Sequence, residues 1–226
     1  MQDPGISVLF KGSNFIRLLE GLSIALRISF LSVVISLLLG FFIGVLISGK
    51  NRFLKIVYGI YLNTVRIMPQ MVLLFIVFFG STRVLGINID AEVSSIIVFA
   101  FWGSAEMADL VRGAIKSIPV HQFESAASLG MKKRTIYLKI ILPQTLRRLV
   151  PSSINLVTRM IKTTSLVMMI GVVEVLKVGQ QIIEANRTTS PNIAFWMYGT
   201  VFLLYFIACF PISRLSKSLE EKWKLA

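Results

Sequence analysis

The sequence predicts an all-α membrane protein that forms one domain over residues 1–226 and crosses the membrane with five helices. Hydrophobic residues make up 55% of the chain and the mean hydropathy is +0.76, which is more than ordinary globular domains carry. The chain also holds apolar runs long enough to cross about 30 Å of hydrocarbon at about 1.5 Å per helical residue. Between these runs, Lys and Arg gather in alternate connections, which is the pattern of a chain that crosses the membrane repeatedly.

The five expected transmembrane helices differ in how cleanly apolar they are. The last one carries no charged residue, whereas Glu106 and Asp109 interrupt the third, and Arg159 and Lys162 lie in the fourth. Such charges each cost roughly 2.5 to 3.5 kcal/mol on insertion scales, so each needs a partner or a water-filled cavity. The expected spans cover, within a few residues, 22–47, 53–80, 93–115, 150–175 and 193–212.

The distribution of positive charge predicts the orientation of these spans. Lys50, Arg52 and Lys55 follow the first span, and a group of basic residues opposed only by Glu124 follows the third. The connections after the second and fourth spans carry no net positive charge. Because cytoplasmic connections concentrate Lys and Arg, we expect the N-terminus outside and the C-terminus in the cytoplasm. The basic group comprises Arg112, Lys116, Lys132, Lys133, Arg134, Lys139, Arg147 and Arg148.

The net charge of +13 comes from 24 Lys and Arg against 11 Asp and Glu. Topology and anionic headgroups explain it, so we expect a lipid membrane and no nucleic acid as a partner. Cys209 and His121 are single residues of their types, which leaves one chain without a zinc ligand set, a disulfide or a Cys/His catalytic pair. We therefore expect no catalytic residue, metal site or cofactor in this chain, and we interpret Cys209 as a small apolar residue of a span.

Several shorter patterns add local expectations. Residues 10–20 mix apolar and charged side chains and predict an amphipathic helix along the outer membrane surface, and residues 179–192 predict a polar outer loop or short helix. Gly40 and Gly44 have the small-xxx-small spacing that permits close helix packing. Residues 44–51 come within one residue of a phosphate-binding loop pattern, but they end in Asn and follow no strand, so we interpret this match as coincidence.

The most informative segment is a polar, basic stretch between the third and fourth spans. It begins with Glu124, continues with small residues, and reaches Gly130 and a Lys-Lys-Arg run before the next helix. Glycine at that point permits a turn with positive φ, and a helix of small residues can be approached closely by another protein. An ordinary basic connection at the membrane surface is the alternative that the residues alone leave open.

This stretch resembles the EAA signature of the membrane subunits of ABC importers. The signature reads Glu-Ala-Ala, three residues, Gly, nine residues and Ile-x-Leu-Pro, and the chain has Glu124, Ala126, Gly130, Ile140 and Leu142-Pro143 at this spacing. A match of that length is highly specific. One position departs, because a serine, Ser125, replaces the first alanine, and a residue this small should not block docking.

About two thirds of the chain resembles the polar amino-acid permeases within that family. The segments over residues 103–119, 142–148 and 162–166 are similar to the third-span and fourth-helix motifs of these permeases, and residues 66–69 are a diverged form of their Arg-Gly-Thr-Pro. Glu106 stands where the family often has an aromatic residue, and Thr163 where it often has an acidic one. These departures concern the identity of the substrate.

The resemblance implies a type I ABC importer permease in the bacterial cytoplasmic (inner) membrane. Two membrane subunits, this chain and a second copy or paralogue, would form the pathway. Two ATP-binding ABC subunits would bind ATP and Mg and hydrolyse the ATP, so this chain is not itself an enzyme, and an extracellular or periplasmic solute-binding protein is expected. Residues 116–143 would form the cytoplasmic coupling loop. The expected ATPase-coupling residues are Glu124, Ser125, Ala126, Ala127 and Gly130.

The charges in the spans suggest how a polar or cationic amino acid would be bound. A zwitterion needs groups of both signs, so we expect Glu106 to contact an ammonium or cationic side chain and Arg66 or Lys162 to contact the carboxylate. Arg66 precedes Pro69, which should break the second span. Polar residues of the fourth span would line the path. The expected substrate-binding residues are Glu106, Arg66, Lys162, Thr163, Ser165 and Asn155.

A structural role for these charges remains open. Asp109 and Arg112 are three residues apart and can form an ion pair on one helical face, while Glu106 can pair with Arg159 or Lys162 between helices. Ser and Thr hydroxyls in membrane helices also bond back to their own backbone. Under these alternatives the charges and hydroxyls hold the helices together.

Other functions are also open. The same importer architecture can carry another small solute, such as an opine or a dipeptide. A secondary carrier or channel also uses intramembrane charges, but such folds commonly contain paired repeats, and no segment of this sequence has a second copy. A passive scaffold would not need Glu106 or Arg159 within its spans.

Overall fold

The computed structural model describes residues 5–49 and 51–224. All regular secondary structure within these ranges is helical, which confirms the predicted all-α class. The α-helices are α1 (Asn14–Ser48), α2 (Arg52–Ile67), α3 (Gln70–Leu85), α4 (Ala91–Lys116), α5 (Val120–Ser128), α6 (Lys133–Ile136), α7 (Leu142–Thr163), α8 (Val175–Asn186) and α9 (Ile193–Lys224). Two short 3₁₀ helices, η1 (Ser7–Phe10) and η3 (Thr164–Ile170), and a π turn, η2 (Tyr137–Ile141), complete the order.

The helices long and apolar enough to cross a membrane only partly match the expected spans. Within the described residues, α1, α4 and Ile193–Trp223 of α9 qualify singly. Arg52–Ile67 with Gln70–Leu85, and Lys133–Ile170 with Val175–Asn186, qualify as bent pairs. The chain therefore has three to five candidate spans, and both the count of five and the orientation of the termini stay predictions.

Two of the expected spans are broken helices. The second breaks at Met68 and Pro69, as the proline predicted: both residues are extended, with ψ of 130° and 132°, because a proline disfavours helical backbone at the preceding residue and supplies no N–H. The region expected as the fourth span is helical from Lys133, continues through η3, and is followed by α8. The boundaries 53–80 and 150–175 therefore do not mark straight helices.

The segment expected as a separate amphipathic helix, residues 10–20, is mostly the beginning of α1. This helix starts at Asn14 and continues into the first expected span without a break, and its position along the outer membrane surface stays a prediction. The amide Nδ2 of Asn14 donates to the carbonyl of Val8 at 2.8 Å, and Nη2 of Arg17 donates to Oε1 of Gln181 on α8 at 2.8 Å. The polar side chains of this segment thus bind the chain's own backbone and α8.

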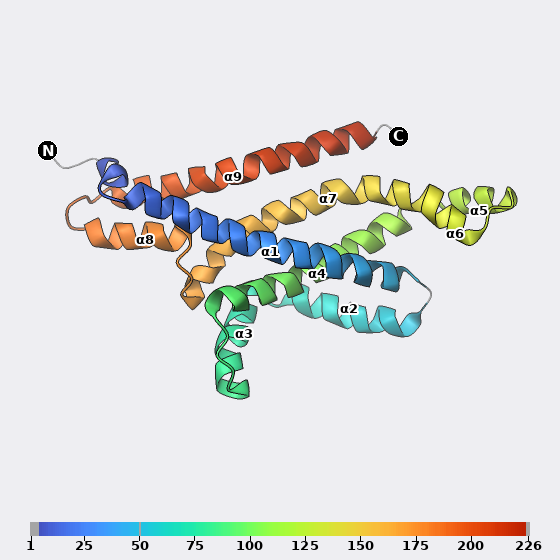
Figure 1. The fold of residues 1–226 in the computed structure, drawn as a ribbon, viewed down its shortest axis with the longest axis horizontal. Coiled ribbons are helices and arrows are strands. Elements are labelled where there is room, and N and C mark those ends of the chain that lie inside the picture. The colour runs from blue at the N-terminus through green and yellow to red at the C-terminus, as the bar shows by residue number, and fades with distance from the viewer. Residues whose placement is uncertain (1–4, 50, 225–226) are drawn as a thin grey trace. The chain divides into compact units, whose positions relative to one another are not determined.

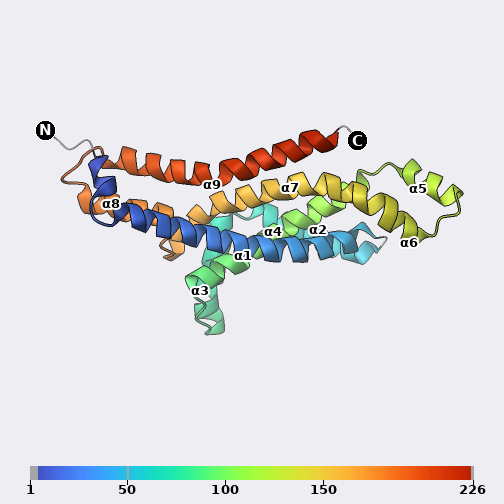
Figure 2. The same ribbon diagram turned by 45° about the horizontal axis from the view of Figure 1, so that its top comes forward.

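Contacts divide the described residues into two compact units. The first comprises residues 5–32, 69–99 and 158–211. Its core brings the beginnings of α1 and α9 against α8, with Leu18, Val175, Ile182 and Met197 buried, and Figures 1 and 2 show these helices side by side. The expected short helix over 179–192 corresponds to the end of α8.

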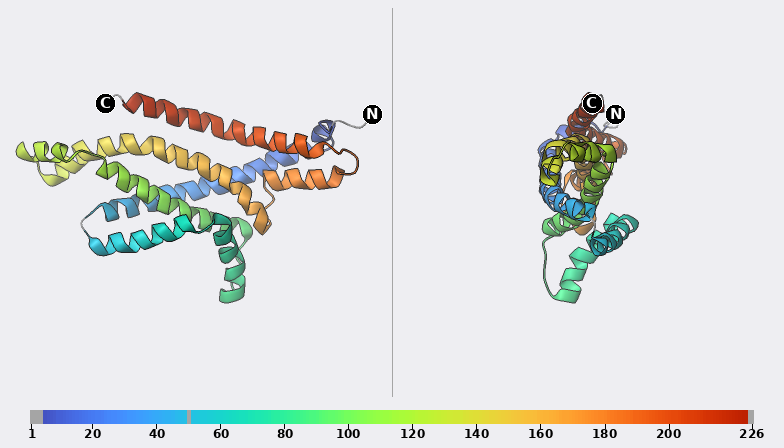
Figure 3. Two further views of the ribbon diagram at one scale, coloured as in Figure 1. Left: turned by 180° about the vertical axis from the view of Figure 1, so that it is seen from behind. Right: turned by 90° about the vertical axis from the view of Figure 1, so that its right-hand side faces the viewer.

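The second unit comprises residues 33–49, 51–68, 100–157 and 212–224. In it, α1 approaches α4 closely at the two glycines that sequence predicted. A Cβ added at Gly40 or at Gly44 would lie 2.5 Å from the Cβ of Met107 or Val111, so only glycine fits there. The unit also holds α5 and α6, which fold against each other beside the start of α7 (Figure 3).

Candidate functional site

A cluster of four charged side chains joins α2 to α4 in the second unit. Nη2 of Arg66 lies 2.8 Å from Oδ2 of Asp109, and its Nε lies 3.4 Å from Oε1 of Glu106. Arg112 donates to Oδ1 of Asp109 from Nε at 3.1 Å. The cluster therefore holds two cations and two anions. Its exposure is uneven, because the Arg66 side chain is 48% exposed and the Glu106 side chain 14%.

Two tyrosines fix α2 against α4 beside this cluster. The hydroxyl of Tyr58 donates to the carbonyl oxygen of Ala105 at 2.9 Å. The hydroxyl of Tyr61 donates to the carbonyl of Phe101, and the two rings pack edge to face with centroids 4.8 Å apart. Because these bonds reach backbone carbonyls of α4, they hold α2 against α4 and leave the charged side chains to pair with one another.

The pairing in this cluster matches the predictions in part. The ion pair between Asp109 and Arg112 is confirmed. Glu106 forms an ion pair with Arg66, which was not predicted as its ion-pair partner. The predicted partners, Arg159 and Lys162, belong to the first unit. The packing of α2 on α4 thus places Arg66 and Glu106, both expected to bind substrate, in contact with each other.

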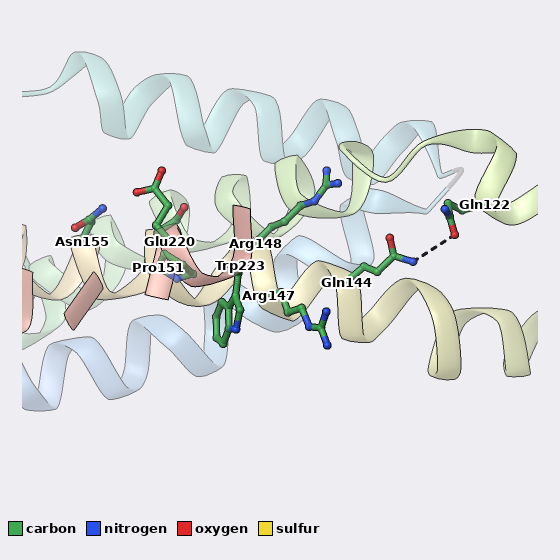
Figure 4. A pocket seen from close by; sticks show the side chains of 9 residues that line it. Gln122, Gln144, Arg147, Arg148, Pro151, Asn155, Glu220 and Trp223 are labelled. Carbon is green, nitrogen blue, oxygen red and sulfur yellow. Dashed lines mark hydrogen bonds between the residues drawn. The ribbon is translucent and has the colours of Figure 1, made fainter. Parts of the chain in front are cut away.

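A polar pocket of about 860 Å³ lies along one face of α7 in the second unit. It contains Asn155, another expected substrate residue, and Arg147 and Arg148, which belong to the basic group that follows the third expected span (Figure 4). The residues of α7 that line it recur every three or four positions, so α7 turns a polar face to the pocket. The lining residues are Gln122, Gln144, Arg147, Arg148, Pro151, Ser152, Asn155, Glu220 and Trp223.

The remaining expected substrate residues lie in the first unit. Lys162 and Ser165 line a smaller pocket of about 290 Å³ together with aromatic residues of α9. The hydroxyl of Thr163 donates to the carbonyl of Arg159 at 2.9 Å, and that of Ser165 to the carbonyl of Lys162 at 3.0 Å. Both hydroxyls thus bond back to their own helix, as the structural alternative expected.

The expected coupling loop over residues 116–143, called the coupling segment below, has the local structure that its sequence predicted. The helix α5 ends at Ser128, Gly130 follows with φ of +73°, and a new helix begins at Lys133. The positive φ explains the glycine, because side chains with a Cβ rarely adopt this conformation. A small core of Ile118, Ala126, Ile136 and Ile141 holds the segment together, and the Phe123 and Tyr137 rings pack at 5.0 Å beside it.

Burial separates the expected ATPase-coupling residues into two groups. Glu124, Ser125, Ala127 and Gly130 are exposed. Ala126, by contrast, is 4% exposed and faces the segment's own core, where its small size lets α5 pack on Ile136 and Ile141. Its part in ATPase coupling stays a prediction. Sequence reasoning missed Leu129, which is 82% exposed beside Gly130 and presents a large apolar side chain next to the polar face of α5.

A further acidic residue, Glu174, was not among the candidates. It is fully buried in the first unit. Its carboxylate accepts hydrogen bonds from the backbone amides of Leu176 and Lys177, both at 2.9 Å, and from the hydroxyl of Tyr205 at 3.0 Å. These bonds cap the N-terminus of α8. Glutamate is an unusual capping residue, so its sequence position gave no signal for this role.

Known proteins resemble this chain along most of its length. The family model for the inner membrane component of binding-protein-dependent transport systems matches residues 36–225. A permease protein of Rickettsia conorii named GlnP, for glutamine transport, is 27% identical over 206 residues, covering 91% of this chain and 92% of that protein. The nopaline transport system permease protein NocM of Agrobacterium fabrum is 30% identical over 220 residues, covering 93% of this chain and 88% of NocM.

The fold also matches a solved structure. The crystal structure of an amino acid ABC transporter with histidines contains a chain that aligns with a TM-score of 0.87 and 25% sequence identity, over 98% of this chain and 100% of that one. The two chains therefore share this fold.

Proposed function

Because this chain belongs to the family of binding-protein-dependent transport system inner membrane components and has the type I ABC importer permease fold, we propose that it is the permease subunit of an ATP-driven importer for amino acids. The observation that carries the proposal is the coupling segment, in which α5, a positive-φ glycine and a new helix follow one another at the spacing of the EAA signature. Relatives named for glutamine and amino-acid transport support the amino-acid cargo.

In this proposal α5 docks on a separate ATP-binding subunit. The exposed residues Glu124, Ser125 and Ala127 form the contact. The helix ends before Gly130, and the exposed side chain of Leu129 adds an apolar contact with the ATP-binding subunit. That subunit binds ATP and Mg and hydrolyses the ATP, and this chain performs no chemistry. The N-terminus lies outside and the C-terminus in the cytoplasm of a bacterial inner membrane, with a solute-binding protein on the outer side.

Movement of α5 would reach the pathway through α7. The backbone is helical from Lys133 to Thr163 and passes through the π turn at Tyr137–Ile141, so the coupling segment is continuous with the helix whose polar face lines the large pocket. A second permease subunit, a copy or a paralogue, completes the pathway. Closure of the ATPase subunits on ATP would then turn the cavity outward, and hydrolysis would reset it.

The charged cluster on α2 and α4 supports a zwitterionic cargo with polar or cationic character. Arg66 can hold a carboxylate in a bidentate manner, while Glu106 and Asp109 can hold an ammonium or a cationic side chain. The long contact of 3.4 Å between Arg66 and Glu106 is weak as an ion pair, so cargo can replace it at little cost. Lys162, Thr163, Ser165 and Asn155 are proposed as further contacts along the path.

A second candidate cargo is an opine, which the similarity to the nopaline permease favours. Opines carry an amino-acid moiety with additional carboxylates, so they would use the same cationic groups. A competition assay with labelled glutamine separates the candidate cargoes. Unlabelled nopaline should suppress glutamine uptake if the importer takes opines. Unlabelled arginine should suppress it if the importer takes cationic amino acids.

The test uses membranes in which this chain is assembled with its ATP-binding subunit. It compares the variants Glu124→Lys and Gly130→Trp with the wild type. Both variants should insert into the membrane but lose co-purification of the ATP-binding subunit and ATP-driven amino-acid uptake. Glu184→Lys on α8, also an exposed acid, is the matched control and should retain both. Uptake that proceeds without ATP and ignores the α5 changes would instead establish a secondary carrier or channel.

A further inference from the structure

The coupling segment is attached to the rest of its unit by two different ends. On the α7 side the backbone is helical, but it passes through the π turn at Tyr137–Ile141. On the α4 side the helix ends at Lys116, and a short non-helical link over residues 117–119 precedes α5. Single π turns are rare and local irregularities of this kind are where helices bend. Either end could therefore yield when α5 is pushed.

One side chain closes the base of this segment. Nη1 of Arg148 donates to the backbone carbonyl of Ser117 at 2.6 Å and lies 2.7 Å from the Ser117 hydroxyl oxygen. That hydroxyl in turn donates to the carbonyl of Ala114 in the last turns of α4, at 2.8 Å. A guanidinium that binds a backbone carbonyl just beyond a helix C-terminus is favoured by charge and by the helix dipole. Arg148 thus ties α7 to the end of α4.

The position of this contact relative to the π turn is informative. Arg148 lies on α7, about two turns beyond Ile141, so the contact bypasses the π turn and holds α7 directly to the link that leads into α5. A weaker bridge, from Nε2 of Gln144 to Oε1 of Gln122 at 3.5 Å, joins α7 to α5 in the same direction. Together with the core of the segment, these contacts make α5 and the start of α7 one body.

We propose that Arg148 is a positioning residue for coupling: it prevents the link and the π turn from absorbing the movement of α5, so that each ATPase cycle shifts α7. This inference rests on the proposed function and names a residue of the coupling path that lies outside the EAA signature. Without the contact, the ATP-binding subunits still dock and still hydrolyse ATP, but a smaller share of the cycles moves the pathway helix.

The neighbouring arginine provides a matched control. Arg147 is exposed and lines the same pocket, but among the described residues it makes no hydrogen bond or ion pair. Removal of its charge changes the electrostatics of the pocket as much as removal of Arg148 does. A difference between the two variants therefore reports on the contact with Ser117 and not on the charge of the pocket.

The experiment measures uptake and ATP hydrolysis together in proteoliposomes that contain the complete importer. The probes are labelled glutamine and labelled arginine, and the variants are Arg148→Gln, Arg148→Lys, Arg147→Gln and Ser117→Ala. Arg148→Gln should lower the number of molecules taken up per ATP hydrolysed about tenfold, the scale of losing one hydrogen bond to a charged group. Arg148→Lys, which keeps a donor, should restore part of the ratio, and Ser117→Ala, which keeps the backbone carbonyl, should change it little.

Three results would overturn the inference. The first is an unchanged ratio of molecules taken up per ATP hydrolysed in Arg148→Gln, and the second is an equal loss of this ratio in Arg147→Gln. The third is a higher KM of uptake in both variants at an unchanged ratio, which would assign both arginines to cargo binding. Co-purification of the ATP-binding subunit and the thermal unfolding midpoint should stay near wild type in Arg148→Gln, since a merely structural role would lower both. A wild-type importer without ATP-driven uptake of either probe overturns the proposed function itself, whereas a coupled wild type with an indifferent Arg148 overturns only this inference.

Discussion

Glu106 lies within the third expected span and Glu174 at the end of the fourth, and the surroundings of these two acids differ. Glu174 is fully buried, and its carboxylate accepts three hydrogen bonds from its own unit. The Glu106 side chain is 14% exposed and lies 3.4 Å from Arg66, the more exposed of the two arginines in its cluster, at 48%. The first acid stabilises a helix terminus, whereas for the second we propose that cargo replaces its contact with Arg66. Of the two acids, we therefore propose only Glu106, whose cluster reaches the surface through Arg66, as a cargo contact.

The strongest test of this contrast removes the buried acid. Glu174→Ala leaves two backbone amides and the Tyr205 hydroxyl without an acceptor, which should destabilise the protein by about 3 kcal/mol or more, since each buried unsatisfied group costs about 1–3 kcal/mol. The thermal unfolding midpoint in detergent should fall accordingly. Glu184→Ala, an exposed acid of the same helix, is the control and should change the midpoint little. A variant of normal stability with an altered KM would make Glu174 a cargo residue instead.

A second prediction concerns the helix packing that surrounds Glu174. A Cβ added at Gly21 would lie 2.7 Å from the backbone nitrogen of Val175, whereas one added at Gly59 meets nothing within 4 Å. Gly21→Ala should thus force α1 away from α8 and cost about 1–3 kcal/mol. Gly59→Ala should be neutral or stabilising by up to about 1 kcal/mol. Equal unfolding midpoints for the two variants would contradict the close approach.

The smallest expected effect on stability comes from the charged cluster on α2 and α4. Glu106→Gln should change the free energy of unfolding by less than about 1 kcal/mol, because glutamine keeps the size and the accepting oxygen of glutamate, the contact with Arg66 is long at 3.4 Å, and Arg66 keeps Asp109 at 2.8 Å. The KM of amino-acid uptake should rise about tenfold, which corresponds to the loss of roughly 1.4 kcal/mol of binding.

The control for this variant is Glu92→Gln, which removes another ion-paired acid of α4. It should leave uptake unchanged. If Glu106→Gln leaves both uptake and cargo-stimulated ATP hydrolysis at wild-type values, the cargo role of Glu106 is wrong and the cluster only joins α2 to α4.

Sequence reasoning succeeded where the backbone decides the outcome. The break at Pro69, the positive φ of Gly130 and the close approach at Gly40 each follow from what one residue type permits. Spacing within one helix also sufficed, as in the pair of Asp109 and Arg112.

It failed where packing between distant segments decides. Arg66 and Glu106 are forty positions apart, and their contact depends on how α2 lies on α4. The burial of Ala126 depends on the neighbouring turns of η2 and α6. The role of Glu174 depends on Tyr205 and on α8 beginning next to it. None of these relations leaves a periodic pattern in the sequence.

The measurement that tests the central claim most directly is accumulation of labelled amino acid by proteoliposomes containing this chain, its ATP-binding subunit and its solute-binding protein. ATP is supplied on the side of the ATP-binding subunit, and ADP replaces it in the control. The account predicts that glutamine or arginine accumulates above its outer concentration with ATP and only equilibrates, or stays outside, with ADP. Accumulation that is the same with ATP and ADP would contradict it.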